Sequence, residues 1–495
     1  MTTLDLLSDR SLPRRWAAVL GAEPSRPVVY DDESGWVSRE ELEAASRSFA
    51  RSLADAGLEP GDRIVMSSAP SVSLAVAHVA ALRLGLVVVP MNTAYTRREI
   101  EHVVADSAPA AVAADEERRA RLVADARGGA PLVTVRLAPG SPPSIEDSRS
   151  RAAGTADPDL DTADAEDPAL LVYTSGTTGA PKGALLSHGN LLASAEAVRL
   201  AWHWTEEDRL VLPLPLFHVH GLAVGLHGTL AAGGSVVLRR RADPADLGAA
   251  LEEHAATMLF SVPTIYARLA GERRLSPLRL CVSGSAPLPA GLHRRIEGAT
   301  GQRILERYGM TEALMIASNP YEGERRPGTV GFPLPGVQLR IDAEGGGEVL
   351  VRGPNVFSGY WRRADATAAA FEGGWFRTGD VGELDADGYL RLTARKSELI
   401  ITGGYNVYPR EVEDVLRGHP AVLDAAVVGW PDPEWGEQVV AFVVTDGPVA
   451  EPELLALAAE QLAPYKRPRR IVQVRDLPRN ALGKVVKSEL GPPAG

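Results

Sequence analysis

The chain has 495 residues, 45% of them hydrophobic, which is enough for a large buried core and about three domains' worth of chain. Its 64 acidic and 52 basic residues give a formal net charge of −12, which argues against nucleic-acid or anionic-membrane partners. The single cysteine, Cys281, excludes an intrachain disulfide, so we expect a reducing, cytoplasmic setting and a buried strand at this residue.

The N-terminal residues lack the basic flank and the apolar run of a secretory signal, so we expect the mature chain to begin at Met1. The most apolar stretch, residues 73–90, is interrupted by His78 and Arg83. It falls short of the roughly 20 clean residues of a membrane span, so we expect no transmembrane segment and no membrane partner.

Helices and strands are predicted to alternate along the first half of the chain. Apolar spacing predicts helices at 38–53 and 71–85 and strands at 63–66 and 86–90. The rhythm returns with a helix at 192–201, a glycine-rich helix after His220, and strands at 209–212 and 235–238. This alternation predicts a layered α/β core with parallel sheets. Between the two runs, residues 139–168 are predicted to be a linker-like loop without chemistry.

Residues 171–183 run from an apolar strand into a loop of glycines and hydroxyl residues that ends on Lys182. Gly176 and Gly179 allow backbone amides to approach an anion closely, and the hydroxyls add donors. The pattern predicts a phosphate-binding loop, though no Walker Gly-Lys-Ser/Thr follows the glycines. The structural alternative is a polar surface turn.

Only five of the 52 basic residues are lysine, so arginine is the usual cation of this chain. An ammonium in place of a guanidinium suggests a site that needs a compact point charge. We apply this argument to Lys182 and to Lys484, which follows the turn-rich residues 477–483. Lys396 and Lys487 are expected to be ordinary solvated side chains.

A domain boundary is expected near Arg395, which divides the chain into residues 1–394 and 395–495. The second unit has its own pattern of elements. Pro409 is a good helix start, residues 411–416 have helical apolar spacing, and residues 425–429 follow as a strand.

Three further clusters share the character of the phosphate loop, namely residues 306–312 after an apolar strand, 375–380 after a Gly-Gly turn, and 403–406 after the strand at 399–402. Each is expected to end a strand, where ligand sites of α/β proteins lie. With the loop and Lys484, this ordered set resembles the acyl-adenylating superfamily of acyl-CoA synthetases, adenylation domains and luciferases, over essentially the whole chain. The resemblance implies a large N-terminal domain of layered α/β subdomains and a small, mobile α+β C-terminal domain that carries the catalytic lysine.

The resemblance implies an ATP-dependent reaction in which a carboxylate forms acyl-AMP and pyrophosphate, and a thiol then takes the acyl group. Lys484 would bridge the carboxylate and the α-phosphate, with Thr311 beside that phosphate and Glu312 binding Mg²⁺. Tyr308 would stack on adenine, and Asp380 and Arg395 would hold the ribose. The implied nucleotide site comprises Thr174, Ser175, Gly176, Thr177, Thr178, Gly179, Lys182, Ser285, Ala286, Pro287, Glu306, Arg307, Tyr308, Gly309, Met310, Thr311, Asp380 and Arg395.

The acid is predicted from Arg307, which stands where synthetases for apolar acids commonly carry a small or uncharged residue. Its planar fork fits a second carboxylate, which an apolar pocket could not hold without a large desolvation penalty. With Ser285 assisting, and His218 (also counted among the catalytic residues), Val219 and Met310 shaping the cavity, the set looks most like malonyl-CoA synthetases acting on malonate or methylmalonate. The alternatives are a salt bridge from Arg307 to Glu306 or another neighbouring acid, and a packed core histidine at His218.

Coenzyme A is the expected thiol, and the resemblance places its pantetheine arm along the Gly403-Gly404 loop with Tyr405. Lys466 and Arg467 are cations that suit the ribose phosphate of coenzyme A, although they would equally suit an acidic carrier protein. A hinge is expected at Lys396 or Ser397, and a lysine acetyltransferase acting on Lys484 is a candidate partner. Three other functions stay open: a synthetase for another short acid, an adenylation enzyme loading a carrier protein, and a nucleotide-binding sensor without turnover.

Overall fold

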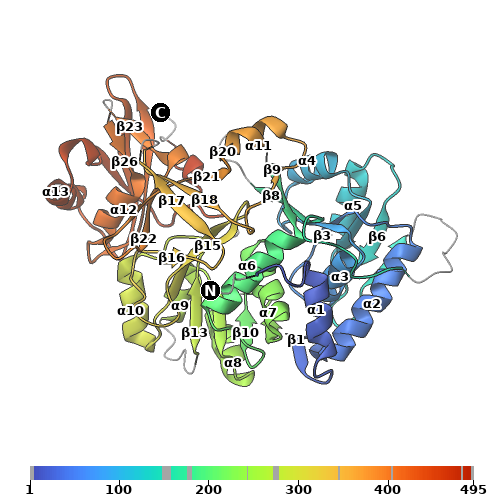
Figure 1. Ribbon diagram of the computed structural model, residues 1–495. Helices are drawn as coiled ribbons and strands as arrows, with labels where there is room; N and C mark the ends of the chain where they lie inside the picture. The colour runs from blue at the N-terminus through green and yellow to red at the C-terminus, as the bar shows by residue number, and fades with distance from the viewer. Residues whose placement is uncertain are drawn as a thin grey trace.

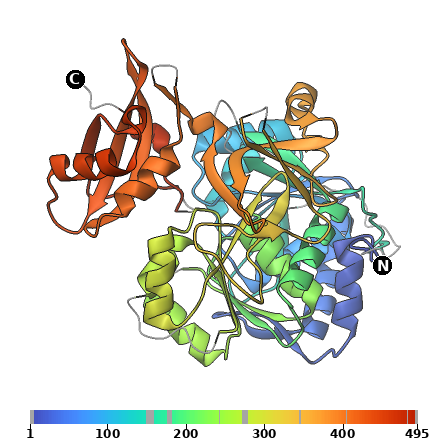
Figure 2. The same ribbon diagram turned by 60° about the vertical axis from the view of Figure 1, so that its left-hand side comes forward.

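A computed structural model describes residues 5–147, 158–174, 181–241, 243–270, 278–343, 346–402, 405–480 and 483–491. It has a large N-terminal domain and a small C-terminal domain, as expected for the acyl-adenylating fold. Figures 1 and 2 show the small domain at one end of the molecule.

The first sheet of the large domain has eight strands, parallel at its centre and antiparallel at both edges. In spatial order these are β19 (Gly359–Tyr360), β9 (Lys182–Ser187), β8 (Pro168–Thr174), β4 (Val87–Pro90), β3 (Arg63–Ser67), β5 (Ala111–Ala114), β6 (Val133–Arg136) and β7 (Ser144–Asp147). The antiparallel β8–β9 pair joins the two ends of the predicted phosphate loop.

The second sheet has nine strands and carries the residues predicted to bind adenine and the acid. In spatial order these are β16 (Phe332–Pro333), β15 (Leu314–Ser318), β14 (Leu305–Met310), β13 (Leu280–Ser283), β12 (Met258–Ser261), β10 (Arg209–Leu212), β11 (Ser235–Leu238), β1 (Pro27–Asp31) and β2 (Gly35–Ser38). Cys281 is buried in β13 as predicted, and its burial raises the pKa of the thiol to about 12.

Helices surround and separate the two sheets (Figure 1). They are α1 (Leu12–Gly21), α2 (Arg39–Asp55), α3 (Val72–Arg83), α4 (Arg97–Ser107), α5 (Glu117–Ala126), α6 (His188–Ala201), the π-helix η1 (His220–Leu226), α7 (His227–Ala232), α8 (Pro244–Glu253), α9 (Pro263–Leu269), α10 (Ala290–Thr300) and α11 (Ala364–Ala370). Helix α6 begins four residues earlier than its apolar spacing predicts, because Ser187 and Asn190 form a reciprocal capping box.

A third, five-stranded sheet completes the large domain and leads toward the small one. It contains β17 (Gln338–Asp342), β18 (Glu348–Arg352), β21 (Trp375–Leu384), β20 (Phe371–Glu372) and β22 (Leu390–Arg395). Phe357 and Phe376 lie in the main apolar cluster of the large domain, which ends at Leu390.

The small domain has its own five-stranded sheet and two apolar clusters formed between Ile400 and Leu490. Its elements are η2 (Lys396–Glu398), β23 (Ile400–Thr402), β24 (Tyr405–Val407), α12 (Pro409–Arg417), β25 (Val422–Asp432), β26 (Gly436–Thr445), α13 (Glu451–Gln461), η3 (Pro464–Lys466), β27 (Arg470–Gln473) and η4 (Lys487–Glu489). The main core of the large domain ends at Leu390 and that of the small domain begins at Ile400, on either side of residue 395.

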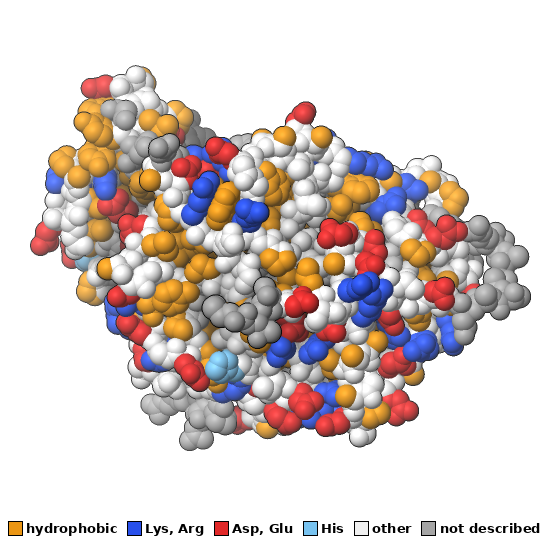
Figure 3. All heavy atoms as spheres, in the orientation of Figure 1, with side chains coloured by type: hydrophobic (Ala, Val, Ile, Leu, Met, Phe, Trp, Pro, Cys, Tyr) orange, Lys and Arg blue, Asp and Glu red, His pale blue; other side chains and the backbone are white. Residues whose placement is uncertain are grey.

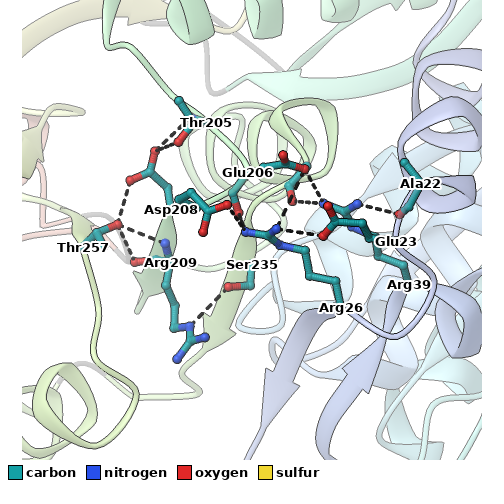
Figure 4. Close-up of polar contacts among 12 residues, drawn as sticks. Ala22, Glu23, Arg26, Arg39, Thr205, Glu206, Asp208, Arg209, Ser235 and Thr257 are labelled. Atoms are coloured by element: carbon teal, nitrogen blue, oxygen red, sulfur yellow. Dashed lines mark hydrogen bonds and ion pairs between the residues drawn. The ribbon is translucent and has the colours of Figure 1, made fainter.

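Partly buried polar contacts join distant parts of the large domain (Figure 4). The guanidinium of Arg39 donates to the carbonyl of Ala22 at 2.6 Å and pairs with Glu206 at 3.4 Å. Beside them, the Thr257 hydroxyl donates to Asp208 at 2.8 Å. These contacts fix the loop before β10 against α2 and the end of α1.

Two predictions about loops are wrong. Residues 144–147, inside the expected linker, form β7, which pairs with β6 and extends the sheet by one edge strand. The clusters at 306–312 and 375–380 were each expected to end a strand. Strand β14 does end inside the first cluster, at Met310, but β21 begins at Trp375, directly after the predicted Gly-Gly turn, and runs through the second. Antiparallel partners, β15 for β14 and β22 for β21, continue the pairing past the glycines of both clusters.

On the face shown in Figure 3, acidic and basic side chains are interspersed. Within the described ranges, no helix is both long and apolar enough to cross a membrane.

Candidate active site

The phosphate loop is described at its two ends. Thr174 and Lys182 are paired residues of β8 and β9, and the Thr174 hydroxyl lies 3.4 Å from the Lys182 carbonyl. The Lys182 ammonium lies 5.3 Å from the ring centroid of Tyr360, a cation–π contact that orients the lysine. The predicted contacts Ser175, Gly176, Thr177, Thr178 and Gly179 lie outside the described residues.

Glu312, the predicted magnesium ligand, accepts a hydrogen bond from the Tyr360 hydroxyl at 3.0 Å. The carboxylate is 7% exposed, and burial raises its pKa although Tyr360 and the charge of Arg395 oppose the rise. Among the described residues, no group of three or more His, Cys, Asp or Glu side chains could enclose a metal. A single carboxylate fits Mg²⁺, which commonly binds through one or two carboxylates and substrate phosphates.

Tyr308 and Arg395 both hold Asp380. The Tyr308 hydroxyl donates to Asp380 Oδ2 at 2.6 Å, and Arg395 Nε lies 3.2 Å from Oδ1. Burial raises the pKa of Asp380, while Arg395, Tyr308 and Lys484 lower it. The structure therefore brings together three residues that the sequence predicts around adenine and ribose, from β14, β21 and β22.

Lys484 reaches this cluster from the C-terminal tail. Burial and the charge of Arg395 lower the pKa of Lys484, and Glu398 and Asp380 raise it, with a net fall. The adjacent Gly483 has φ +74°, and a Cβ there would lie 3.1 Å from Thr264 Oγ1 in α9 of the large domain. The tail is thus docked against the large domain with its lysine among the site charges.

Arg307 is buried in β14 without a counter-charge. The side chain is 5% exposed, and burial lowers its pKa to about 9, so it stays cationic at neutral pH. Within the described part of the chain, no carboxylate pairs with it, and its Nε and Nη2 atoms have no hydrogen-bond partner. The alternative of a salt bridge to Glu306 is absent, because Glu306 Oε1 instead accepts from the Leu288 amide at 2.9 Å.

The guanidinium of Arg307 lies directly against the backbone of Gly284. A Cβ on Gly284 would come within 2.2 Å of Arg307 Cζ, so no larger residue fits there without displacing the arginine. Ser285 follows with φ +68°, and its hydroxyl lies 3.1 Å from Nδ1 of His220. The predicted pair Ser285 and Arg307 therefore flank the same glycine.

The remaining predicted residues of the acid and nucleotide sites differ in their burial. Burial lowers the pKa of His218 to about 4, so the ring is neutral. Val219, Met310 and Thr311 are half-buried, and Gly309 packs its backbone against Leu314. Ala286 and Pro287 continue the loop after Ser285 and become progressively exposed. Their roles stay predictions.

The residues predicted to bind coenzyme A lie on the small domain. Tyr405 is largely exposed and stacks on Tyr465, with ring centroids 4.7 Å apart. Lys466 is paired with Glu411 at 2.6 Å, and Arg467 donates to carbonyls at the end of α13. Gly403 and Gly404 lie outside the described residues, as does the side chain of the candidate hinge Ser397.

Three side chains near the site were missed by sequence reasoning. Tyr360 reaches Glu312 and Lys182 from β19, about 50 residues or more away in sequence. His220 was not predicted to be a site residue; it is buried, and its Nδ1 contacts the Ser285 hydroxyl. Lys487, expected to be solvated, is held between two glutamates. The aromatic and histidine side chains carry no local signal, since only folding brings them to the site.

The chain matches two family descriptions in succession. Residues 16–361 match the family "AMP-binding enzyme", and residues 411–484 match "AMP-binding enzyme C-terminal domain". The two matches lie on either side of the predicted boundary.

Known relatives cover most of the chain. It is 36% identical to a feruloyl-CoA synthase of Amycolatopsis sp. over 468 residues, which is 91% of this chain and 92% of the relative. It is 35% identical to a malonate–CoA ligase of Arabidopsis thaliana over 478 residues, covering 87% and 78%. The crystal structure of ATP-bound MatB from Rhodopseudomonas palustris is 38% identical, with a TM-score of 0.88 over 97% of this chain and 98% of the other.

Proposed function

The chain belongs to the AMP-binding enzymes and is an AMP-forming acid–CoA ligase, and from this premise we propose that its acid is a short dicarboxylate, with malonate preferred and methylmalonate accepted. The observation that carries the proposal is the buried, unpaired guanidinium of Arg307 beside Gly284 and Ser285. The malonate–CoA ligase among its relatives supports the same substrate.

The electrostatics of Arg307 favour an anionic ligand. A buried cation without a partner is unfavourable, and a second carboxylate would restore the hydrogen bonds that its Nε and Nη2 lack. A monocarboxylate would leave this charge unpaired and would meet a polar wall. The distal carboxylate, held by Arg307 and Ser285, would leave the other carboxylate free to react.

Adenylation needs two anions to meet, because the carboxylate must attack the α-phosphate of ATP. We assign Lys484 to the space between them, with Thr311 as a donor to the same phosphate. Lys182 and the loop from Thr174 would hold the β- and γ-phosphates, so that pyrophosphate leaves opposite the attack. Tyr308, Asp380 and Arg395 would hold the nucleoside, because a carboxylate accepts from a ribose diol.

Glu312 is the residue that would hold Mg²⁺. When bound, the ion supplies charge neutralisation between phosphates. The Tyr360 hydroxyl fixes the orientation of the Glu312 carboxylate through its hydrogen bond, and the ammonium of Lys182 makes a cation–π contact with the ring of the same tyrosine. Tyr360 therefore connects the metal ligand with the phosphate loop.

The competing proposal is ligation of an aryl or other monocarboxylic acid, which the feruloyl-CoA synthase among the relatives supports. A carrier-protein thiol in place of coenzyme A is a further alternative. The two proposals differ at Arg307, because only a dicarboxylate uses its charge. The thiol is decided separately by competition between coenzyme A and phosphopantetheinylated carrier.

The test is acid-dependent pyrophosphate release and CoA-thioester formation with ATP and Mg²⁺. Malonate, methylmalonate, succinate, acetate, octanoate and benzoate are compared for the wild type and Arg307→Met. Loss of a charged, paired contact should lower kcat/KM for malonate by roughly 100-fold and leave acetate unchanged or improved. Arg39→Met, which removes another buried arginine far from Gly284, is the control and should keep the wild-type preference. Wild-type preference for a monocarboxylate would overturn the dicarboxylate assignment.

A further inference from the structure

The short tail segment that carries Lys484 is anchored on both sides of this lysine. C-terminal to Lys484, Lys487 Nζ lies 3.0 Å from Glu398 and 2.8 Å from Glu413. N-terminal to Lys484, Arg479 pairs with Asp424. The lysine itself is therefore flanked by two fixed points in the sequence.

The loop between these anchors is also closed on itself. The Asn480 side chain accepts from the Lys484 amide at 3.0 Å, and the Asn480 amide donates to the Lys484 carbonyl at 2.9 Å. Arg479 Nη1 donates to the Gly483 carbonyl at 2.6 Å. Arg479 therefore contacts both the turn before Lys484, through the Gly483 carbonyl, and the rest of the small domain, through Asp424.

The two anchors meet inside the small domain. Arg417 of α12 lies 3.1 Å from Asp424 and 3.7 Å from Glu413, so it contacts the acidic partner of each anchor. Glu413 is 7% exposed, and its Oε1 atom accepts from the Val427 amide at 2.9 Å. We call this connected set the tail network: Glu398, Lys487, Glu413, Arg417, Asp424 and Arg479.

One end of the tail network lies at the connection between the domains. Glu398 closes the short helix η2, which directly follows Arg395. Arg395 in turn pairs with Asp380 at 3.2 Å. The contacts of Lys487 therefore link the catalytic tail with the turn that leaves the nucleotide site.

We propose that Lys487 and Arg479 are positioning residues, which hold Lys484 at the site for acyl-adenylate formation through the tail network. The inference rests on the proposed role of Lys484 but not on the identity of the acid. A flexible lysine on an unanchored tail would spend less time between the two anions, and a displacement of about 1 Å can slow a reaction roughly 100-fold.

The two half-reactions separate this role from a merely structural one. Lys484 acts on the charges of ATP and the acid, so loosening the tail should slow adenylation and spare thioester formation from preformed acyl-adenylate. The variants are Lys487→Met, which removes the charge, and Lys487→Arg, which retains it. Glu453→Gln is the control, because it removes the charge from the 3.1 Å contact with His419 in the same domain without touching the tail network.

Acid-dependent exchange of pyrophosphate into ATP measures the first half-reaction, with whichever acid the wild type prefers. Lys487→Met should lower it by roughly 10- to 100-fold, with thioester formation from acyl-adenylate and CoA within about threefold of wild type. Lys487→Arg should recover most of the exchange, and Glu453→Gln should keep both rates.

Equal losses in both half-reactions, or unchanged exchange in Lys487→Met, would overturn the positioning role. Each variant is assayed with the acid that the wild-type enzyme prefers. If that acid is a monocarboxylate, the malonate proposal is wrong, but the comparison of Lys487→Met with the wild type still tests the positioning role.

Discussion

Tyr308 on β14 donates a hydrogen bond to Asp380 on β21 at 2.6 Å, joining the second and third sheets of the large domain at the proposed nucleotide site. Tyr308 is buried and Asp380 is half-buried, and Arg395 holds the other oxygen of the carboxylate. The pair presents an aromatic face and an oriented acceptor from two separate sheets, so the nucleoside site depends on how these sheets pack.

Tyr308→Phe should raise KM for ATP by roughly 10-fold, because it keeps the ring but removes a hydrogen bond to a charged group. The rate at saturating ATP should change less. Initial rates over an ATP series measure this. Tyr389→Phe is the control, since its hydroxyl donates to the Glu324 carbonyl at 2.9 Å away from the site. An unchanged KM in Tyr308→Phe would show that Asp380 is held well enough by Arg395.

Tyr360→Phe should raise the Mg²⁺ concentration needed for half-maximal activity by roughly 10-fold, as is usual when a group that orients a metal ligand is removed. The substitution keeps the ring beneath Lys182 and deletes only the 3.0 Å bond to Glu312. A Mg²⁺ titration at fixed free ATP gives the measurement. Tyr321→Phe serves as the control, and an equal shift in both variants would contradict the role of the Tyr360 hydroxyl.

Glu306 should make stability fall with rising pH. Burial raises its pKa to about 7, so the folded state holds this proton in a range where the unfolded chain has released it. The contribution of the protonated Glu306 side chain to the free energy of unfolding is therefore complete below the unfolded pKa of about 4.3, and it is lost as pH rises toward 7.

Glu306→Gln mimics the protonated form and should remove this dependence. Between pH 5 and 7.5, the free energy of unfolding of the wild type should fall relative to Glu306→Gln by a few kcal/mol, about 1.4 kcal/mol for each unit of pKa difference. Urea unfolding at several pH values measures it. The control Glu252→Gln, at an exposed position of α8, should show the same pH dependence of the unfolding free energy as the wild type. If the Leu288 amide and Arg410 keep the Glu306 carboxylate ionised, Glu306→Gln will also show the wild-type dependence, and the prediction is wrong.

Asp161→Asn should lower the free energy of unfolding by about 1–3 kcal/mol, because it weakens the partner of a buried arginine. Arg83 is 3% exposed and pairs with Asp161 at 2.9 Å and with Glu43 at 3.3 Å. Urea unfolding at neutral pH gives the comparison. Asp159→Asn, two residues earlier and exposed, should have no such effect. Equal stability of the two variants would mean that Glu43 alone satisfies Arg83.

Asp161 also shows where reasoning from composition fails. It lies in the segment predicted to be a linker, and nothing in its neighbours indicates that Arg83, 78 residues earlier, needs a counter-charge. Lys487 is similar, because a lysine near the end of a chain looks solvated until the tail folds back against Glu398 and Glu413. Ion-pair partners distant in sequence leave no periodic signal.

The sequence by itself determined the local and repeated features: the alternation of helices and strands, the burial of Cys281, and the order of motifs that gave the family. These depend on apolar spacing, capping and short glycine patterns, which act over a few residues. Only the tertiary structure decided that Arg307 is buried against Gly284 without a counter-charge, that Tyr360 reaches Glu312, and that Lys484 is held from both sides. Each of these contacts joins strands, sheets or domains that the chain brings together only through packing of its cores, so no local pattern could specify them.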